Sequence, residues 1–426
     1  MLCNLLKLYF QINTPSPHSV TMLRIHAIRD RITTLQTDED VSLAKNKVKK
    51  FRPVLKLVRE YLARTKAVYY GGTAINAYLP PSARFYGPED VPDYDVFVSN
   101  PEEVAQEVAD LLYSNGYHFV TVRNAIHAGT FKISWEFEDV LDLSMVSKRE
   151  ERLLYETATS TKDGLRLANT ELLKANAYIE LSAPKGSIHR WEKVMDRVYR
   201  LEKAYPVSKG SYEITYSKID PSIKKITQRV WKRVTSEDYP IIGVQAMRYY
   251  TNEPFDLGVR YHARFRVLQV LAISVSDCVT SILAAVGKKN VRTRVYTTNT
   301  KSTLVAPKTC VDVMPSGKTK WTRLVSVHDC SKRCITVQRA PNGVMYGSLF
   351  YLVSALYMHN FLKTTSTDIT ELTTKNARMI DTLLKSISTS DFDTNCYGVS
   401  KSLLSVKKSR ARKQMRLVVY NPESKS

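Results

Sequence analysis

Two adjacent glycines, Gly71 and Gly72, constrain the fold more than any other feature of the sequence. Residues 67–70, before them, have the apolar composition of a buried strand, and residues 73–79, after them, have a helical pattern that two prolines end. Glycine allows close approach of the backbone to a ligand, and a helix that begins directly after it directs N–H groups at a bound anion. This corner predicts an α/β fold with a phosphate-binding turn.

Three aspartates follow in two further strand patterns. Asp93 and Asp95 lie in an alternating strand over residues 93–98, and Asp142 lies in an apolar strand over residues 140–146. Side chains two residues apart on a strand share a face, which Asp142 can join from a neighbouring strand. Three close carboxylates repel one another unless cations neutralise them, and hard divalent ions prefer such oxygen ligands. The sequence therefore predicts a two-ion site of the kind that activates a hydroxyl and stabilises a leaving pyrophosphate.

The patterns around these motifs predict a mixed α/β unit. Helices are expected over residues 38–66 and 101–115, and strands over 130–137 and 140–146. Residues 151–205 have mostly helical patterns. Strands and helices that alternate in this way are typical of a sheet flanked by helices.

The order of these motifs resembles the nucleotidyltransferase superfamily related to DNA polymerase β. More narrowly, residues 40–206 resemble the poly(A) polymerase catalytic subunits of large DNA viruses. The stretches that carry the resemblance are residues 69–76, 92–97, 140–144 and 178–193. The resemblance implies a palm-like mixed sheet in which Asp93, Asp95 and Asp142 bind Mg²⁺ or Mn²⁺. It also implies that Asp142 helps to deprotonate the 3′-hydroxyl of RNA.

The resemblance also implies a site for ATP. Gly71, Gly72 and Thr73 would hold the triphosphate. Two residues of the helix that follows the carboxylate strands, Lys174 and Asn176, are candidates for contacts to the triphosphate and the ribose. A solvated lysine on a helix surface is the simpler interpretation of Lys174.

The charge of the chain indicates a polyanionic partner. Its 63 Lys and Arg residues against 41 Asp and Glu residues give a net charge of +22. Nucleic acid and an acidic membrane surface are both compatible with this excess. Residues 187–205 have an apolar face and a second, basic stripe, for which we expect contacts to RNA phosphates rather than to solvent alone. This stripe consists of Arg190, Lys193, Arg197 and Arg200. The basic run at 407–416 is either a nucleic-acid-binding arm or a solubilising tail.

The second half has the pattern of a degenerate copy of the first. Residues 239–250 align with residues 67–78, and Gly243 follows an apolar pair as Gly71 does. The strand expected next, 265–271, contains no carboxylate. The predicted organisation is therefore an N-terminal extension (1–37), a catalytic domain with a helical extension (38–206), a nucleotidyltransferase-like domain without a metal site (207–385) and a Ser/Lys/Arg-rich tail (386–426).

Several other features suggest alternatives. Six cysteines in a chain of 426 residues are too sparse for a disulfide framework, so we expect packing cysteines in a reducing compartment. A zinc site at His328, Cys330 and Cys334 lacks a second ligand pair. Residues 1–10 make a poor signal peptide. The apolar residues 344–362 are long enough to span a membrane, although a buried helix has the same pattern.

Together with these features, the resemblance implies an enzyme that adenylates RNA 3′ ends without a template. It would transfer AMP from ATP with two Mg²⁺ or Mn²⁺ ions. We expect a homodimer or pairing with a viral processivity subunit, no membrane association, and a location in the viral factory of the host cytoplasm or in the virion. The alternatives are a CCA-adding, uridylyl-adding or oligoadenylate-forming enzyme, or a non-catalytic RNA-binding subunit. Three intact acids argue against the last.

Overall fold

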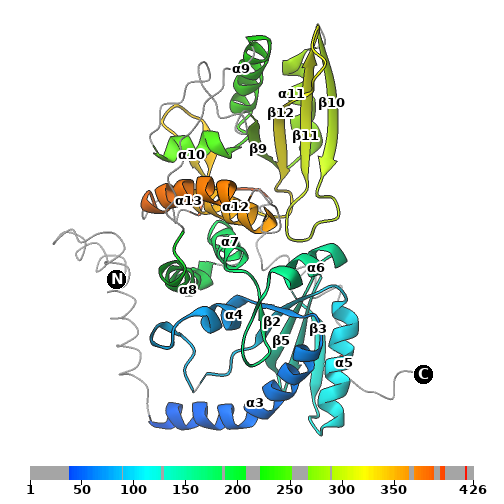
Figure 1. Cartoon of the computed structure of the whole chain (residues 1–426), viewed down its shortest axis with the longest axis vertical. Coiled ribbons are helices and arrows are strands. Elements are labelled where there is room, and N and C mark those ends of the chain that lie inside the picture. The colour runs from blue at the N-terminus through cyan, green and yellow to red at the C-terminus, as the bar shows by residue number, and fades with distance from the viewer. Residues whose placement is uncertain are drawn as a thin grey trace, which may run out of the picture. The chain divides into compact units, whose positions relative to one another are not determined.

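The computed structural model describes residues 38–88, 90–125, 129–184, 188–207, 221–251, 267–287, 290–363, 369–387, 394–398 and 418–419. It contains two mixed sheets flanked by helices (Figure 1), which confirms the predicted α/β class. By its contacts the chain divides into one unit of residues 1–53 with 86–91 and a second of residues 54–85 with 92–426. The second unit holds both sheets and all the site residues considered below.

The first sheet has the order β16-β3-β4-β5-β2-β1-β7-β6. Its strands are β1 (Val68–Tyr70), β2 (Tyr94–Val98), β3 (Val120–Asn124), β4 (Thr130–Trp135), β5 (Glu138–Met145), β6 (Thr159–Ser160), β7 (Arg166–Leu167) and β16 (Val418–Val419). Its helices are α3 (Asp38–Arg64), α4 (Gly71–Tyr78), α5 (Pro101–Ser114), α6 (Lys148–Thr157), α7 (Thr170–Leu181) and α8 (Trp191–Ala204), with short 3-10 turns at Pro81–Ala83 and Ile188–Arg190.

The central strands form where the sequence is most apolar. Val96 on β2 and Leu141 and Leu143 on its parallel neighbour β5 are fully buried, as expected where helices cover a parallel strand pair. Helix α5 begins with Pro101 at its first position and buries apolar residues at helical spacing, among them Val104, Val108 and Leu112. The buried pair β2 and β5 carries the predicted aspartates.

The second sheet has the order β10-β11-β12-β9-β8-β14-β13-β15. Its strands are β8 (Ile241–Ile242), β9 (Leu268–Ala272), β10 (Val291–Thr298), β11 (Lys308–Pro315), β12 (Thr322–Asp329), β13 (Ile335–Arg339), β14 (Met345–Gly347) and β15 (Cys396–Tyr397). Its helices are α9 (Pro221–Ser236), α10 (Val244–Thr251), α11 (Val275–Val286), α12 (Leu349–Lys363) and α13 (Ile369–Lys385).

The second sheet repeats the topology of the first. Apart from the end strands β16 and β15, the two strand orders match position by position, and every matching pair runs in the same relative direction. Both sheets also have a register shift at the corresponding place, between Ile133 and Ser134 in β4 and between Val311 and Asp312 in β11. The repeat that the short sequence match indicated thus extends over a whole sheet.

A buried carboxylate on α6 binds the loop between β10 and β11 within the second compact unit. Glu150, in the first turn of α6, accepts hydrogen bonds from the backbone N–H groups of Thr303 (3.0 Å) and Leu304 (3.1 Å) and from the Ser302 hydroxyl (2.6 Å). It also completes a capping box with Ser147. The loop between β10 and β11 is therefore held against the first half of the chain by one side chain.

The apolar segment 344–362 does not form a single helix. It contains β14, a break at Ser348 and most of α12, whose residues are largely buried. Among the described helices, none has the length and apolar character that crossing a membrane requires. The run is apolar because α12 is packed on most sides, against α7 and α13 among others.

The prediction that every cysteine is a packing cysteine is wrong for one pair. Cys334, just before β13, and Cys396, in β15, form a disulfide. The sequence did not indicate this bond because residue 396 lies in a polar segment whose pairing with β13 has no apolar pattern. Cys278, Cys310 and Cys330 are free and buried, and in the described part of the chain His328, Cys330 and Cys334 form no metal-ligand cluster. Cys3 and the basic run 407–416 lie outside the described residues.

Candidate active site

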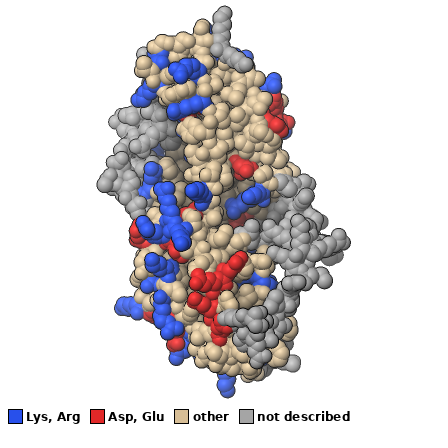
Figure 2. Space-filling view, turned by 90° about the vertical axis from the view of Figure 1, so that its right-hand side faces the viewer, with Lys and Arg blue, Asp and Glu red and all other residues tan. Residues whose placement is uncertain are grey.

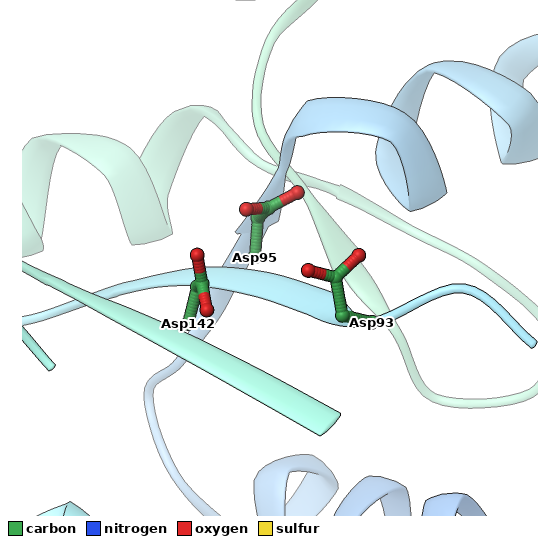
Figure 3. A group of neighbouring side chains, drawn as sticks. All are labelled: Asp93, Asp95 and Asp142. Atoms are coloured by element: carbon green, nitrogen blue, oxygen red, sulfur yellow. The ribbon is translucent and has the colours of Figure 1, made fainter. Parts of the chain in front are cut away.

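Three carboxylates meet on neighbouring strands of the first sheet. Asp95 on β2 pairs in register with Asp142 on the parallel strand β5, and Asp93 lies just before β2. One carboxylate oxygen from each residue lies within 4.8 Å of the other two (Figure 3). All three side chains are partly buried, and all three offer oxygen. This donor set fits a hard divalent cation such as Mg²⁺ or Mn²⁺.

The glycine corner lies directly against this cluster. Tyr70, at the end of β1, pairs with Asp95, so Gly71 reaches the carboxylate of Asp95. Gly71 has a φ of +64°, and a Cβ there would lie 2.8 Å from Cγ of Asp95 and would overlap its Oδ2. Only glycine fits this position. Gly72 is buried in the first turn of α4, and the hydroxyl of Thr73 donates to the carbonyl oxygen of Asp93 at 3.1 Å.

The electrostatics of the cluster favour a bound cation. Burial, together with the neighbouring carboxylates of Asp93 and Asp142, raises the pKa of Asp95 to about 7. Burial also raises the pKa of Asp142, although the Lys132 ammonium opposes the shift. Because the acids resist ionising together, a divalent ion that neutralises them binds favourably.

Asp142 forms a salt bridge with Lys132, a residue that the sequence did not indicate as part of the site. Lys132, opposite Asp142 on the antiparallel strand β4, places its ammonium 2.6 Å from Asp142 Oδ2 and 3.0 Å from Asp139 Oδ2. Asp139 in turn pairs with Arg123 on β3. The signal for Lys132 was weak, because a lysine in a strand next to an acidic turn is common on protein surfaces. Its position opposite Asp142 depends on the register of β4 against β5.

The predicted basic stripe on α8 divides into two parts. Burial, Arg197 and Arg190 lower the pKa of Lys193, whereas Asp93 and Asp95 oppose that shift. Arg190 acts on the pKa of Asp95 in the lowering direction. Arg190 and Lys193 therefore lie within electrostatic range of the acidic cluster. Both side chains are exposed, and Arg190 also pairs with Glu180 at 3.2 Å.

The other two residues of the stripe, Arg197 and Arg200, pack against residues 83–85. The guanidinium of Arg197 stacks on the ring of Phe85, 4.6 Å from its centroid. Arg200 is only 7% exposed, donates to both oxygens of Asp196 at 2.9 and 3.0 Å, and donates to the Ala83 carbonyl at 2.9 Å. The expectation that Arg200 faces RNA is therefore wrong. Its position on the helix is that of the basic stripe, but the buried carboxylate of Asp196, one turn earlier, forms a salt bridge with its guanidinium.

Lys174 does not lie where the sequence placed it. Its side chain is 1% exposed, and its ammonium pairs with Glu202 at 3.0 Å and donates to the Tyr205 carbonyl at 2.5 Å. An ammonium held in this way cannot contact a triphosphate. Neither interpretation of the sequence, nucleotide contact or solvated lysine, was right. Asn176 lies partly buried on α7, and none of its described contacts links it to the acids, so its role stays a prediction.

The mixed sheet, the glycine corner and the three acids on adjacent strands are arranged as the motif order predicted for a nucleotidyltransferase-like site. Residues 56–187 match the family described as "Poly(A) polymerase catalytic subunit", which confirms the resemblance predicted from the motifs. The match lies within the stretch 40–206 that the motifs indicated.

The relatives of the chain are viral proteins. A protein of African swine fever virus named "Putative poly(A) polymerase catalytic subunit" is 31% identical over 170 residues, which is 38% of this chain and 35% of that protein. One of the same name from Acanthamoeba polyphaga mimivirus is 24% identical over 208 residues, 47% of this chain and 35% of that protein. The matched part thus spans about a third of these relatives.

A solved structure extends the likeness to the whole fold. The Megavirus polyadenylate synthase superimposes with a TM-score of 0.72 at 17% identity, over 97% of this chain and 88% of that one. Both sheets described above therefore belong to a fold found in that viral protein.

Proposed function

We propose that this chain is a template-independent RNA adenylyltransferase, which transfers AMP from ATP to the 3′-hydroxyl of RNA. The observation that carries the proposal is the convergence of Asp93, Asp95 and Asp142 beside the Gly71 corner, within the segment that matches the family. In the transfer, the 3′-oxygen bonds to the α-phosphorus, the bond from that phosphorus to the bridging oxygen breaks, and pyrophosphate leaves.

Asp93, Asp95 and Asp142 would hold Mg²⁺ or Mn²⁺. Bound there, such ions would supply activation of the attacking hydroxyl and charge stabilisation of the leaving pyrophosphate. Asp142 would accept the proton of the 3′-hydroxyl, the role that the resemblance to the poly(A) polymerase catalytic subunits implies for it. The Lys132 ammonium positions that carboxylate and keeps its charge compensated before substrate arrives.

The triphosphate has two sources of positive potential in this arrangement. The first turn of α4 presents backbone N–H groups at Gly72 and Thr73. Arg190 and Lys193 add two cations within electrostatic range of the acids. We assign Arg190 and Lys193 to the triphosphate and keep Arg197 as an RNA contact.

A primer-extension assay tests the function. The purified chain is incubated with a labelled RNA primer, Mg²⁺ or Mn²⁺ and each ribonucleoside triphosphate in turn, and products are resolved on a denaturing gel. We expect a ladder with ATP, and loss of the ladder in Asp95→Asn. The exposed acid Asp277, on α11, provides the control variant Asp277→Asn. Preferred incorporation of CTP or UTP would instead favour a CCA-adding or uridylyl-adding enzyme, and no incorporation at all would contradict the proposal.

The partners and location expected for such an enzyme, a homodimer or a viral processivity subunit in the host cytoplasm, stay predictions. Size-exclusion chromatography with light scattering on the purified chain tests the first of them.

A further inference from the structure

A face of the second sheet is both cationic and aromatic. Edge strand β10 carries Arg292, Arg294 and Tyr296 at alternate positions, so their side chains share one side of the sheet. Trp321 and Arg323, at the start of β12, join them across β11. We call these five residues the β10–β12 face. Arg292 and Arg294 are exposed and the others are partly exposed.

A buried aspartate fixes two of the arginines. Asp312 on β11 is 2% exposed, and its Oδ2 accepts from Arg294 Nε at 2.9 Å and from Arg294 Nη2 at 2.7 Å. Its Oδ1 accepts from Arg323 Nε at 2.6 Å. Burial opposes ionisation of Asp312, but the bonds from Arg323 and Arg294 outweigh it and lower its pKa. The acid therefore orients two guanidinium groups without presenting negative charge at the surface.

The aromatic rings stack with the same cations. The guanidinium of Arg294 lies 4.7 Å from the centroid of Trp321 and 5.5 Å from that of Tyr296. Arg323 lies 5.2 Å from the Tyr296 centroid, and Arg292 lies 5.9 Å from that of Trp321. Within the described residues, Arg292 has no carboxylate partner. Guanidinium groups and aromatic rings thus lie close together on this side of the sheet.

The turn before β12 adds to the charge of this end of the sheet. Lys318 and Lys320 are both exposed there. Lys and Arg side chains gather at the upper end of the view in Figure 2, where Figure 1 shows α9 and the strands β10, β11 and β12. The β10–β12 face therefore lies in a positive surrounding.

The repeated topology shows how this face differs from the active site. In the first sheet the corresponding side carries Lys132, Asp139 and Asp142. By strand register, Ser326 occupies the position of Asp142, and Arg323 occupies that of Asp139. On corresponding sides, the first sheet carries acids that fit a cation, whereas the second sheet carries cations that fit an anion.

We propose that the β10–β12 face binds single-stranded RNA, the substrate of the proposed function, on which this inference rests. Arginines would contact phosphates, and bases would stack on the exposed side of Trp321 and Tyr296. An unpaired strand fits better than a duplex, because only unstacked bases offer their flat faces to side chains. An acidic peptide would satisfy the charge but would leave the aromatic rings without a partner.

RNA binding in the absence of catalysis tests the inference. Fluorescence anisotropy of a labelled single-stranded oligoadenylate is measured in EDTA without ATP, in an Asp95→Asn background, over a range of salt concentrations. Trp321→Leu removes a stacking surface. Arg292→Gln removes a cation that, unlike Arg294 and Arg323, does not pair with the buried Asp312. Arg152→Gln, an exposed arginine on α6, and Thr293→Ala, which points to the other side of β10, are the matched controls.

We expect Trp321→Leu to weaken binding about tenfold. Arg292→Gln should lower the slope of log affinity against log salt by about 0.7, by more than Arg152→Gln does, and Thr293→Ala should change nothing. Melting curves of each variant confirm that the fold is retained. Unchanged affinity and slope in the two variants, or equal displacement of RNA by an acidic peptide, would overturn the inference.

The two proposals fail in different ways. If the wild-type chain transfers no AMP, the proposed function is wrong, whatever the anisotropy shows. If it extends a short primer and the two variants bind RNA as the wild type does, only the β10–β12 assignment is wrong.

Discussion

Gly71 and Asp95 are in contact across the first pair of strands, so closely that no side chain can be added between them. A Cβ at Gly71 would lie 2.8 Å from Cγ of Asp95. The position of the Asp95 carboxylate, which would hold a metal ion, therefore depends on the turn at Gly71, which would hold the triphosphate.

Gly71→Ala should displace the Asp95 carboxylate and lower AMP transfer by about 100-fold, since misplacing a reacting group by about 1 Å has that order of effect. Steady-state primer extension measures the loss. Gly116→Ala is the matched control, because Gly116 also has a positive φ, of +83°, but a Cβ there meets nothing within 4 Å. Both variants should lose about 1–2 kcal/mol of stability from the strained backbone. If Gly71→Ala transferred AMP at the wild-type rate, the position of the Asp95 carboxylate would not depend on the turn.

The metal-free protein should lose stability as the pH rises through the titration of Asp95. Its pKa is raised from 3.8 to about 7 in the folded state, so between these values the folded state binds more protons than the unfolded one. The free energy of unfolding therefore falls with pH over this window. The difference between wild type and Asp95→Asn in denaturant titrations at several pH values isolates this effect. Mg²⁺ should restore the most stability near the upper end, and a difference that does not vary with pH would contradict the expectation.

Glu150→Ala should destabilise the chain by about 1–3 kcal/mol, because it removes the acceptor of the partly buried hydrogen bonds from the N–H groups of Thr303 and Leu304. Burial opposes ionisation of Glu150, but hydrogen bonds from Ser302 and Ser147 hold its pKa at about 2. Its contribution is present above the ordinary pKa of 4.5 and is lost as the pH falls toward about 2. Chemical denaturation measures both effects, with Glu156→Ala, an exposed glutamate on the same helix, as the control.

Lys193→Gln should raise the KM for ATP more than it weakens RNA binding in the absence of ATP. The reason is that Lys193 lies within electrostatic range of Asp93 and Asp95, where the triphosphate is expected. Lys203→Gln, an exposed lysine on the same helix, should change neither quantity. A larger effect on RNA affinity than on the KM would return Lys193 to the RNA-binding stripe predicted from the sequence.

Mn²⁺ should bind to the first sheet and not to the second. At the positions of Asp93, Asp95 and Asp142 the second sheet has Val267, Gln269 and Ser326, which cannot neutralise an ion. Replacing the three acids together by alanine should remove Mn²⁺ binding measured by electron paramagnetic resonance in the presence of ATP. Tight binding by that triple variant would locate a second site elsewhere in the chain.

The sequence was most informative where local pattern and chemistry agree. The helix over 101–115 and the strands over 93–98 and 291–298 lie within a residue of α5, β2 and β10. The three acids could be grouped from period-2 alternation and motif order alone. Strand β3 was missed, because its exposed end, with Arg123 and Asn124, has the composition of a loop.

Features that depend on pairing between distant segments could not be predicted. The burial of Lys174 depends on Glu202, near the C-terminal end of α8, and nothing near Lys174 in the sequence indicates that partner. The salt bridge of Lys132 to Asp142 and the disulfide of Cys334 with Cys396 depend in the same way on the register of strands. Local periodicity predicts on which face of a helix or strand a side chain lies, but it does not predict which residues that face contacts.

The bulge that recurs on β5, opposite β4, and on β12, opposite β11, shows that the shape of this fold survives without its acids. The second sheet keeps the bulge, the strand register and a glycine of positive φ at residue 243, pressed against Gln269 as Gly71 is against Asp95. Packing alone thus suffices to maintain this backbone where the three acids are absent. The two halves are therefore under unequal constraint: reaction chemistry limits substitution in one, whereas its twin is free to acquire a different ligand at no cost to catalysis.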